Sequence, residues 1–128
     1  MIDHVSIAVR DLARCARFYD AVLATLGYGR LVTRPGTVGF GKKYPEFWLN
    51  ERKAMHPVDP DPGSHICLRA SSAEAVRAFH AAAIEAGGMS DGAPGPRSGT
   101  IAGYHAAFVR DPEGNKIEAA TFTRPPSA

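Results

Sequence analysis

The stretch HVSIAVRDLARCARFYDAVLATLG (residues 4–27) decides the fold, because HICLRASSAEAVRAFHAAAIEAGG (residues 65–88) repeats its layout. In each stretch a histidine opens a short apolar run, a phenylalanine follows fourteen positions later, and a glycine closes the pattern. The offset is 61 residues throughout, so that Phe18 corresponds to Phe79. A long period that occurs only twice predicts two copies of one supersecondary unit that face each other, rather than a stacked solenoid.

Each copy begins as a strand and continues as an amphipathic helix. Residues 2–9 alternate between apolar and polar side chains, and Asp11 is the predicted N-cap of the helix that follows. In the second copy, residues 65–70 alternate in the same way. The S-x-x-E pattern of Ser71 to Glu74 then predicts a capping box at the start of a helix that two glycines close.

Short runs with strand character follow both helices. In the first copy they cover residues 28–33, 37–41 and 46–50. In the second copy, residues 104–109 and 116–122 flank a DPEGN turn and form a predicted hairpin. The stretch between residues 89 and 103 is rich in Gly, Pro and Ser, and it predicts only a poor edge strand.

These elements predict an α+β protein made of two βαβββ modules within a single domain, residues 1–128. Module 1 covers about residues 1–50, a proline-containing linker covers 51–63, and module 2 covers about 64–122. We expect the modules to form a curved mixed sheet with the helices on its outer face. The opposite, concave face is then a cup that can hold a ligand.

Composition excludes several classes of partner. The 15 basic and 13 acidic residues are scattered, and the net charge is +2, so we expect neither nucleic acid nor an anionic membrane as a partner. No apolar run approaches the roughly 20 residues of a membrane span, and the chain starts without a secretory pattern, so we expect a cytoplasmic protein. Cys15 and Cys67 form no CxxC motif, and both are predicted to be small buried side chains.

Strand alternation assigns the predicted sheet side chains to two faces. The apolar set should face the helices, and it comprises Val5, Ile7, Phe47, Leu49, Ile66, Leu68, Ile117 and Ala119. His4, His65, Glu118 and Trp48 have the other parity and should line the concave face. Two imidazoles and a carboxylate suit Fe(II), Zn(II), Ni(II), Mn(II) or Co(II) and leave coordination positions open for substrate. The residues alone equally allow solvated histidines and a solvated glutamate.

The chain resembles the vicinal oxygen chelate superfamily, which includes glyoxalase I, bleomycin-resistance proteins, fosfomycin-resistance enzymes and extradiol ring-cleaving dioxygenases. The resemblance rests on residues 3–28, on residues 63–88 and above all on FVRDPEGNKIEA at 108–119. It implies paired βαβββ modules. It also implies metal ligands on the first strand of each module and on the last strand of the chain, which by position are His4, His65 and Glu118.

One position departs from the glyoxalase I pattern. That enzyme supplies a fourth, usually carboxylate, ligand from the last strand of the first module, and Trp48 stands there in this chain. An indole can neither bind the ion nor accept a proton. A one-pleat shift would bring Glu46 or Asn50 to that position instead. Without such a shift, the ligand set is closer to the two-histidine, one-carboxylate triad of the extradiol dioxygenases.

The resemblance implies a divalent-metal-dependent lyase, isomerase or dioxygenase that binds a small substrate through two vicinal oxygens. Trp48, Asn50 and Cys67 are the expected pocket residues, and Tyr104 or His105 is the expected catalytic acid or base, because one of two adjacent strand residues must face the cup. The alternatives are a metal-free binding protein of the bleomycin-resistance type and a scaffold.

Two questions about partners and ligands stay open at this stage. The resemblance implies a homodimer, and the linker is long enough to place the site either within one chain or across two. Arg97 and Arg110 are candidates for binding an anionic substrate, although arginines on a surface are more often simply solvated.

Overall fold

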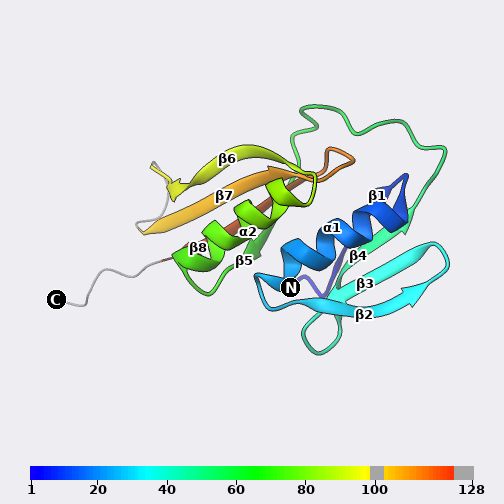
Figure 1. Ribbon diagram of the computed structural model, residues 1–128, viewed down its shortest axis with the longest axis horizontal. Helices are drawn as coiled ribbons and strands as arrows, with labels where there is room; N and C mark the ends of the chain where they lie inside the picture. The colour runs from blue at the N-terminus through cyan, green and yellow to red at the C-terminus, as the bar shows by residue number, and fades with distance from the viewer. Residues whose placement is uncertain (99–102, 123–128) are drawn as a thin grey trace.

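The computed structural model describes residues 1–98 and 103–122, and it contains two βαβββ modules (Figure 1). The first module consists of β1 (Val5–Val9), α1 (Leu12–Ala24), β2 (Gly29–Arg34), β3 (Thr37–Gly41) and β4 (Pro45–Glu51). The second consists of β5 (Ile66–Arg69), α2 (Ala73–Glu85), β6 (Met89–Pro96), β7 (Tyr104–Arg110) and β8 (Lys116–Phe122). The predicted pair of modules is therefore confirmed.

Each module folds its four strands into a separate mixed sheet. The strand order is β1-β4-β3-β2 in the first module and β5-β8-β7-β6 in the second. In both, the first strand runs parallel to the last, and the remaining neighbours are antiparallel. The single curved sheet that the sequence predicted is not formed, since no strand pairing in the described chain joins the inner edges, β1 and β5. A cleft lined by side chains of both modules separates these edges instead.

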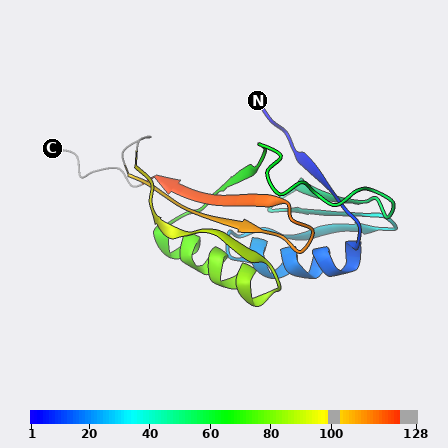
Figure 2. The same ribbon diagram turned by 90° about the horizontal axis from the view of Figure 1, so that it is seen from above.

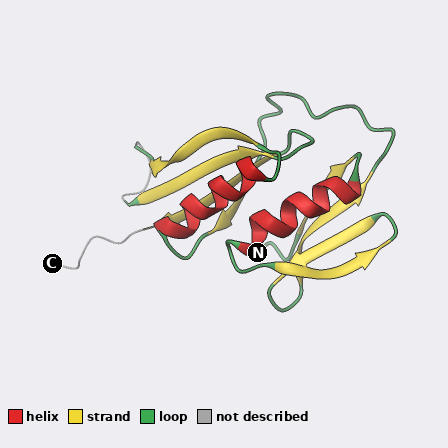
Figure 3. Cartoon of the chain, viewed as in Figure 1, coloured by secondary structure: helices red, strands yellow, loops and turns green. Residues whose placement is uncertain are grey.

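Each helix covers the sheet of its own module, and both lie on the same side of the two sheets (Figure 2). The two helices lie side by side where the modules meet (Figure 3). The predicted parity is confirmed. Phe47, Leu49, Ile117 and Ala119 belong to the core under the helices, and Val5, Ile7, Ile66 and Leu68 pack against it. Because burying one large apolar side chain contributes about 1.5–3 kcal/mol, this layer fixes which sheet face stays open.

The helix starts follow capping rules, with one correction. Asp11 caps α1 as predicted, because its Oδ1 accepts a hydrogen bond from the Arg14 amide at 3.1 Å. The N-cap of α2 is Ser72 rather than Ser71, since Ser72 Oγ accepts from the Ala75 amide at 3.1 Å. Glu74 therefore stands one position too early for a capping box, although it still complements the helix dipole.

Two further expectations need correction. The second module has a full edge strand in β6, because glycine-containing register shifts at Ser90/Gly92 and Gly92/Gly95 let the strand pair with β7. Cys15 is buried as predicted, whereas Cys67 is exposed because it lies on the edge strand β5. Neither helix in the described ranges is long and apolar enough to cross a membrane.

Candidate functional site

The open face of module 2 brings together two of the predicted metal ligands. His65 precedes β5 and Glu118 lies on β8, and the parallel pairing of these strands places both side chains on the face away from the helices. His65 Nε2 stands 2.9 Å from Glu118 Oε1. The Glu118 side chain is only 3% exposed, against 41% for His65. Glu118 Oε2 is buried and has no hydrogen-bond partner among the described residues.

His4 lies apart from this pair. It precedes β1, and Figure 2 shows the N-terminal segment rising from the sheet face opposite the helices. The His4 side chain is 52% exposed, and its Nδ1 lies 2.7 Å from Asp3 Oδ1, which leaves Nε2 free. Within residues 1–98 and 103–122, one chain gathers no group of three potential ligands. The expected cup with all three ligands is therefore not formed by a single chain.

The strand register identifies Trp48 as the counterpart of Glu118. Trp48 pairs with Ser6 in module 1, and Glu118 pairs with Cys67 in module 2. Ser6 and Cys67 correspond in the repeat, so Trp48 occupies the equivalent position on its own strand. The register contains no one-pleat shift that would place Glu46 there. Module 1 therefore presents an indole where module 2 presents a carboxylate.

The Trp48 ring depends on a glycine beneath it. A Cβ atom on Gly39 would lie 2.8 Å from the ring, closer than real contacts allow. We expect Gly39→Ala to displace the indole, to change the fluorescence emission of this single tryptophan, and to lower the free energy of unfolding by about 1–3 kcal/mol. Gly29→Ala is the control, because a Cβ there meets nothing within 4 Å. Unchanged emission in Gly39→Ala would contradict this packing.

The other two predicted pocket residues also lie on open sheet faces. Asn50 Oδ1 accepts a hydrogen bond from Thr37 Oγ1 at 2.8 Å, which fixes its amide on module 1. Cys67 stands beside Glu118, and desolvation, followed by the Glu118 charge and a hydrogen bond with the Glu118 side chain, raises the pKa of its thiol to about 12. The Cys67 side chain is therefore a neutral thiol rather than a thiolate ligand at ordinary pH.

The two candidate acid–base residues point in opposite directions. β7 pairs with β8 without interruption, so Tyr104 shares the face of Phe108 and Glu118, whereas His105 has the helix-facing parity. The Tyr104 ring packs on Phe122, with centroids 5.1 Å apart. Phe108 comes four positions after Tyr104 along the strand, which corresponds to about 13 Å. Neither Tyr104 nor His105 therefore stands next to the His65–Glu118 pair.

Phe108 is a site residue that the sequence analysis did not single out. It pairs with Glu118 across the sheet, and its ring centroid lies 5.7 Å from that of His65. Arg97 and Lys116 approach the same ring, at 5.3 and 5.0 Å from its centroid. The sequence did contain a signal for Phe108. The length of the turn in this hairpin can be read from the sequence, and it places Phe108 on the same face as Glu118.

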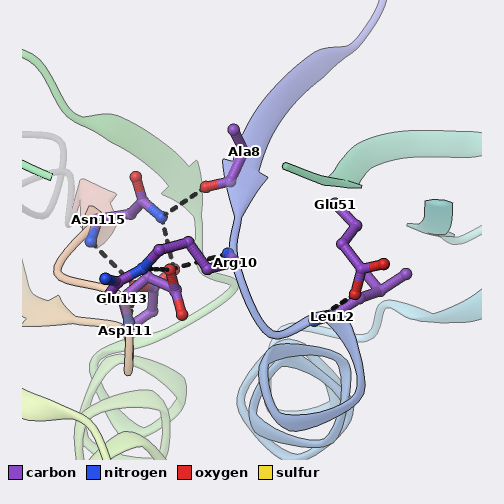
Figure 4. Close-up of polar contacts among 7 residues, drawn as sticks. All are labelled: Ala8, Arg10, Leu12, Glu51, Asp111, Glu113 and Asn115. Atoms are coloured by element: carbon purple, nitrogen blue, oxygen red, sulfur yellow. Dashed lines mark hydrogen bonds and ion pairs between the residues drawn. The ribbon is translucent and has the colours of Figure 1, made fainter. Parts of the chain in front are cut away.

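The turn between β7 and β8 joins the modules. Figure 4 shows Asp111, Glu113 and Asn115 against β1 and Arg10. Glu113 Oε1 accepts hydrogen bonds from the Arg10 backbone amide and Nε, at 2.9 and 3.0 Å, and Asn115 Nδ2 donates to the Ala8 carbonyl at 3.4 Å. We call these three turn residues the intermodule clamp. They fix the module 2 hairpin, and with it Glu118, against module 1.

Asp111 is the buried centre of the clamp. Its Oδ2 accepts a hydrogen bond from the Tyr19 hydroxyl at 2.7 Å, and its Oδ1 accepts from the amides of Glu113 and Asn115 at 2.8 and 2.9 Å. Burial raises the pKa of Asp111, although these hydrogen bonds oppose the shift. Burial also acts to raise the pKa of Glu113, but the bonds from Arg10 outweigh it and leave that pKa below its usual value.

Comparison with known proteins agrees with this architecture. Residues 1–119 match the family described as the Glyoxalase/Bleomycin resistance protein/Dioxygenase superfamily, and the chain belongs to it. A glyoxalase/bleomycin resistance protein from Albidiferax ferrireducens is 36% identical, with a TM-score of 0.81 over 91% of this chain and 95% of that one. No curated protein is significantly similar in sequence.

More distant solved structures share the fold alone. A glyoxalase/bleomycin resistance protein/dioxygenase family enzyme from Burkholderia phytofirmans is 19% identical, with a TM-score of 0.72 over 95% of this chain and 98% of that one. The fosfomycin resistance protein FosX from Listeria monocytogenes is 15% identical, with a TM-score of 0.68 over 94% and 91% of the two chains.

Proposed function

We propose that the protein is a divalent-metal-dependent enzyme that acts on a small substrate through two vicinal oxygens. The observation that carries this proposal is the His65–Glu118 pair. An imidazole nitrogen and a carboxylate oxygen converge at 2.9 Å, and the second carboxylate oxygen is buried without a partner among the described residues. A buried carboxylate oxygen that lacks a hydrogen bond is costly, and coordination of that oxygen to a cation would satisfy it.

The third ligand in this proposal is His4 of a second copy of the chain. His4 stands on the segment that projects from the open face, and Asp3 binds its Nδ1 so that Nε2 is free to coordinate. Met1 and Ile2 are also highly exposed, at 123% and 79%, and pairing with a second chain would cover them. A homodimer would thus contain two sites, each made from both chains.

Each group around the site has a role in the proposed chemistry. When bound, a divalent ion supplies a Lewis acid that polarises the two substrate oxygens. His65 and Glu118 hold and orient it, and the Phe108 ring beside them limits the access of water. Trp48 and Asn50 offer an aromatic wall and a fixed amide on the open face of module 1. The reaction is a lyase, isomerase or dioxygenase step.

Metal content tests the proposal. Protein purified without a chelating tag and exposed to Fe(II), Zn(II), Ni(II), Mn(II) or Co(II) should hold about one ion per chain. Glu118→Gln and His65→Ala should each lower the affinity by at least about tenfold to 100-fold, which is the usual loss when only a residue that orients a metal ligand is removed. His56→Ala is the matched control, because His56 is an exposed histidine of the linker.

Mixing two variants tests the shared site. Chains that carry His4→Ala and chains that carry Glu118→Gln should each, alone, bind metal much more weakly than the parent. A heterodimer of the two contains one site with both native contributions, so unfolding and refolding the mixture should restore metal binding. No recovery in a mixture that does form heterodimers would refute a site that is shared between chains.

A second function is favoured by one observation. The indole of Trp48 lies over Gly39 on the open face of module 1. This position suits a metal-free protein that binds an aromatic or cationic small molecule against the indole. If the parent protein takes up none of the five metals, this binding function replaces the enzymatic one.

A further inference from the structure

Arg97, which follows β6 directly, is fixed in one position on the open face of module 2. Its guanidinium stacks on Phe108 with Cζ 5.3 Å from the ring centroid, and its Nη2 donates to the Ala93 carbonyl at 2.7 Å. Gly92 makes this arrangement possible, because a Cβ there would stand 2.9 Å from Phe108 and 3.2 Å from Arg97 Nη2. Unlike an ordinary solvated arginine, this side chain is already ordered.

The charge of Arg97 has no counterion in the described part of the chain. No carboxylate lies within 4.0 Å of its guanidinium, and its Nε is buried without a hydrogen-bond partner there. Residues 99–102 and 123–128 contain neither Asp nor Glu. An ordered arginine whose charge is uncompensated is suited to bind an anion, since its planar donors match carboxylate and phosphate oxygens.

Arg97 lies next to the proposed ligands. The Phe108 ring lies between them, with its centroid 5.3 Å from Arg97 Cζ and 5.7 Å from the centroid of the His65 ring. A substrate only a few bonds long could therefore contact both Arg97 and His65.

The surroundings add further positive charge. Lys116 Nζ lies 5.0 Å from the Phe108 centroid and 3.2 Å from Asp91 Oδ2. The same Asp91 oxygen also binds Arg110 Nε at 3.1 Å, so one carboxylate serves two cations. The two hydrogen-bonding partners hold the pKa of Asp91 below its usual value despite some desolvation. With Arg97 counted, this side of the face carries three basic side chains, Arg97, Arg110 and Lys116, against the two carboxylates of Asp91 and Glu118.

We propose that Arg97, assisted by Lys116, binds an anionic group of the substrate, a carboxylate or a phosphate, while the vicinal oxygens face His65 and Glu118. The substrate is then a small anion rather than a neutral molecule. The placement of the vicinal oxygens rests on the proposed function. Anion binding at Arg97 does not, because it requires no metal ion.

An NMR titration of protein stripped of metal tests this proposal. Inorganic phosphate, acetate and uncharged acetamide are added separately, and chloride holds the ionic strength constant. The Arg97 Nε–H signal and the amide signals near Phe108 should shift saturably with phosphate or acetate and remain unchanged with acetamide. The anion with the higher affinity identifies the substrate group as a phosphate or a carboxylate.

Three variants complete the test. Arg97→Gln should weaken anion binding by roughly 10- to 100-fold, the usual effect of losing a charged hydrogen bond. Arg77→Gln, which removes an exposed arginine of α2, should leave it unchanged. Asp91→Asn should tighten it by roughly two- to fivefold, because Lys116 and Arg110 lose their carboxylate.

The proposal is overturned if neither anion binds the parent saturably, or if Arg97→Gln binds as tightly as the parent. Weaker binding in Asp91→Asn also contradicts it. Because metal content is measured in a separate experiment, a failure here and a failure of the metal proposal can be told apart.

Discussion

Asp111→Ala is expected to lower the free energy of unfolding by about 3–5 kcal/mol, the cost of breaking a buried charged network. The substitution leaves the Tyr19 hydroxyl and the amides of Glu113 and Asn115 without their acceptor, and Asp111 itself is only 3% exposed. The loss is larger than for an ordinary turn residue because the clamp holds the two modules together. Urea denaturation measures it through the transition midpoint.

Three variants define the scale of this effect. Tyr19→Phe removes one hydrogen bond and should cost only about 1–2 kcal/mol. Asp59→Ala removes an exposed aspartate of the linker and should change stability by less than about 0.5 kcal/mol. Asp111→Asn keeps the shape of the side chain and serves if the alanine variant does not fold. A loss in Asp111→Ala no larger than that in Asp59→Ala would show that the clamp does not stabilise the protein.

The pH dependence of stability gives an independent check of Asp111. Burial raises its pKa above the unfolded value, so the folded state binds this proton more tightly. The part of the free energy of unfolding that comes from this pKa shift is complete below the unfolded pKa and declines as the pH rises through the folded pKa, whereas the hydrogen bonds that Asp111 accepts contribute separately. Asp111→Asn should remove that decline, whereas an unchanged profile would show that Asp111 titrates normally.

Local periodicity was sufficient to predict the elements apart from the full extent of β6, and it placed two of the three candidate ligands on one face. Alternation placed His65 and Glu118 on one face, and both belong to the same module, where parallel pairing of β5 with β8 brings them together. His4 belongs to the other module. Its distance from the pair depends on how the modules pack, and no local pattern encodes that packing. The sequence therefore identified candidate ligands but could not show which of them meet within one chain.

The intermodule clamp shows what pattern reading misses. The DPEGN stretch was correctly predicted as a hairpin turn, but its side chains hydrogen-bond residues about a hundred positions away, such as Arg10. One signal was available. Tyr19 lies in the apolar stripe of α1, and a buried tyrosine hydroxyl requires a hydrogen-bond partner. The sequence therefore predicts that the Tyr19 hydroxyl has a partner, but only the packed structure identifies that partner as Asp111.

The repeat also differs between its halves in a way that bears on function. Trp48 and Glu118 occupy equivalent strand positions, yet one is an indole over a glycine and the other a buried carboxylate with a free oxygen. Two copies under the same structural demand would be expected to carry similar side chains. A carboxylate that is kept where its twin is aromatic, and that costs free energy when it is unpaired, indicates a demand other than stability.

Glu118→Met should therefore stabilise the metal-free protein by about 1–4 kcal/mol, the range seen when a buried ion pair is replaced by well-packed apolar side chains. His65 loses its partner but is 41% exposed, so water can solvate the imidazole. The parent should in turn gain about 4 kcal/mol from a metal at a free concentration roughly 1000-fold above its Kd, and the variant should gain nothing. Urea denaturation with and without Zn(II) measures both differences.

Glu46→Met is the matched control, because Glu46 is a half-buried carboxylate of β4 with the same parity as Trp48. It should shift metal-free stability by no more than about 0.5 kcal/mol and leave the metal-dependent gain intact. The two measurements separate a structural role of Glu118 from a functional one. A structural carboxylate would make Glu118→Met less stable than the parent even without metal, and Zn(II) would then stabilise neither protein; that result would leave the proposed metal site without its central ligand.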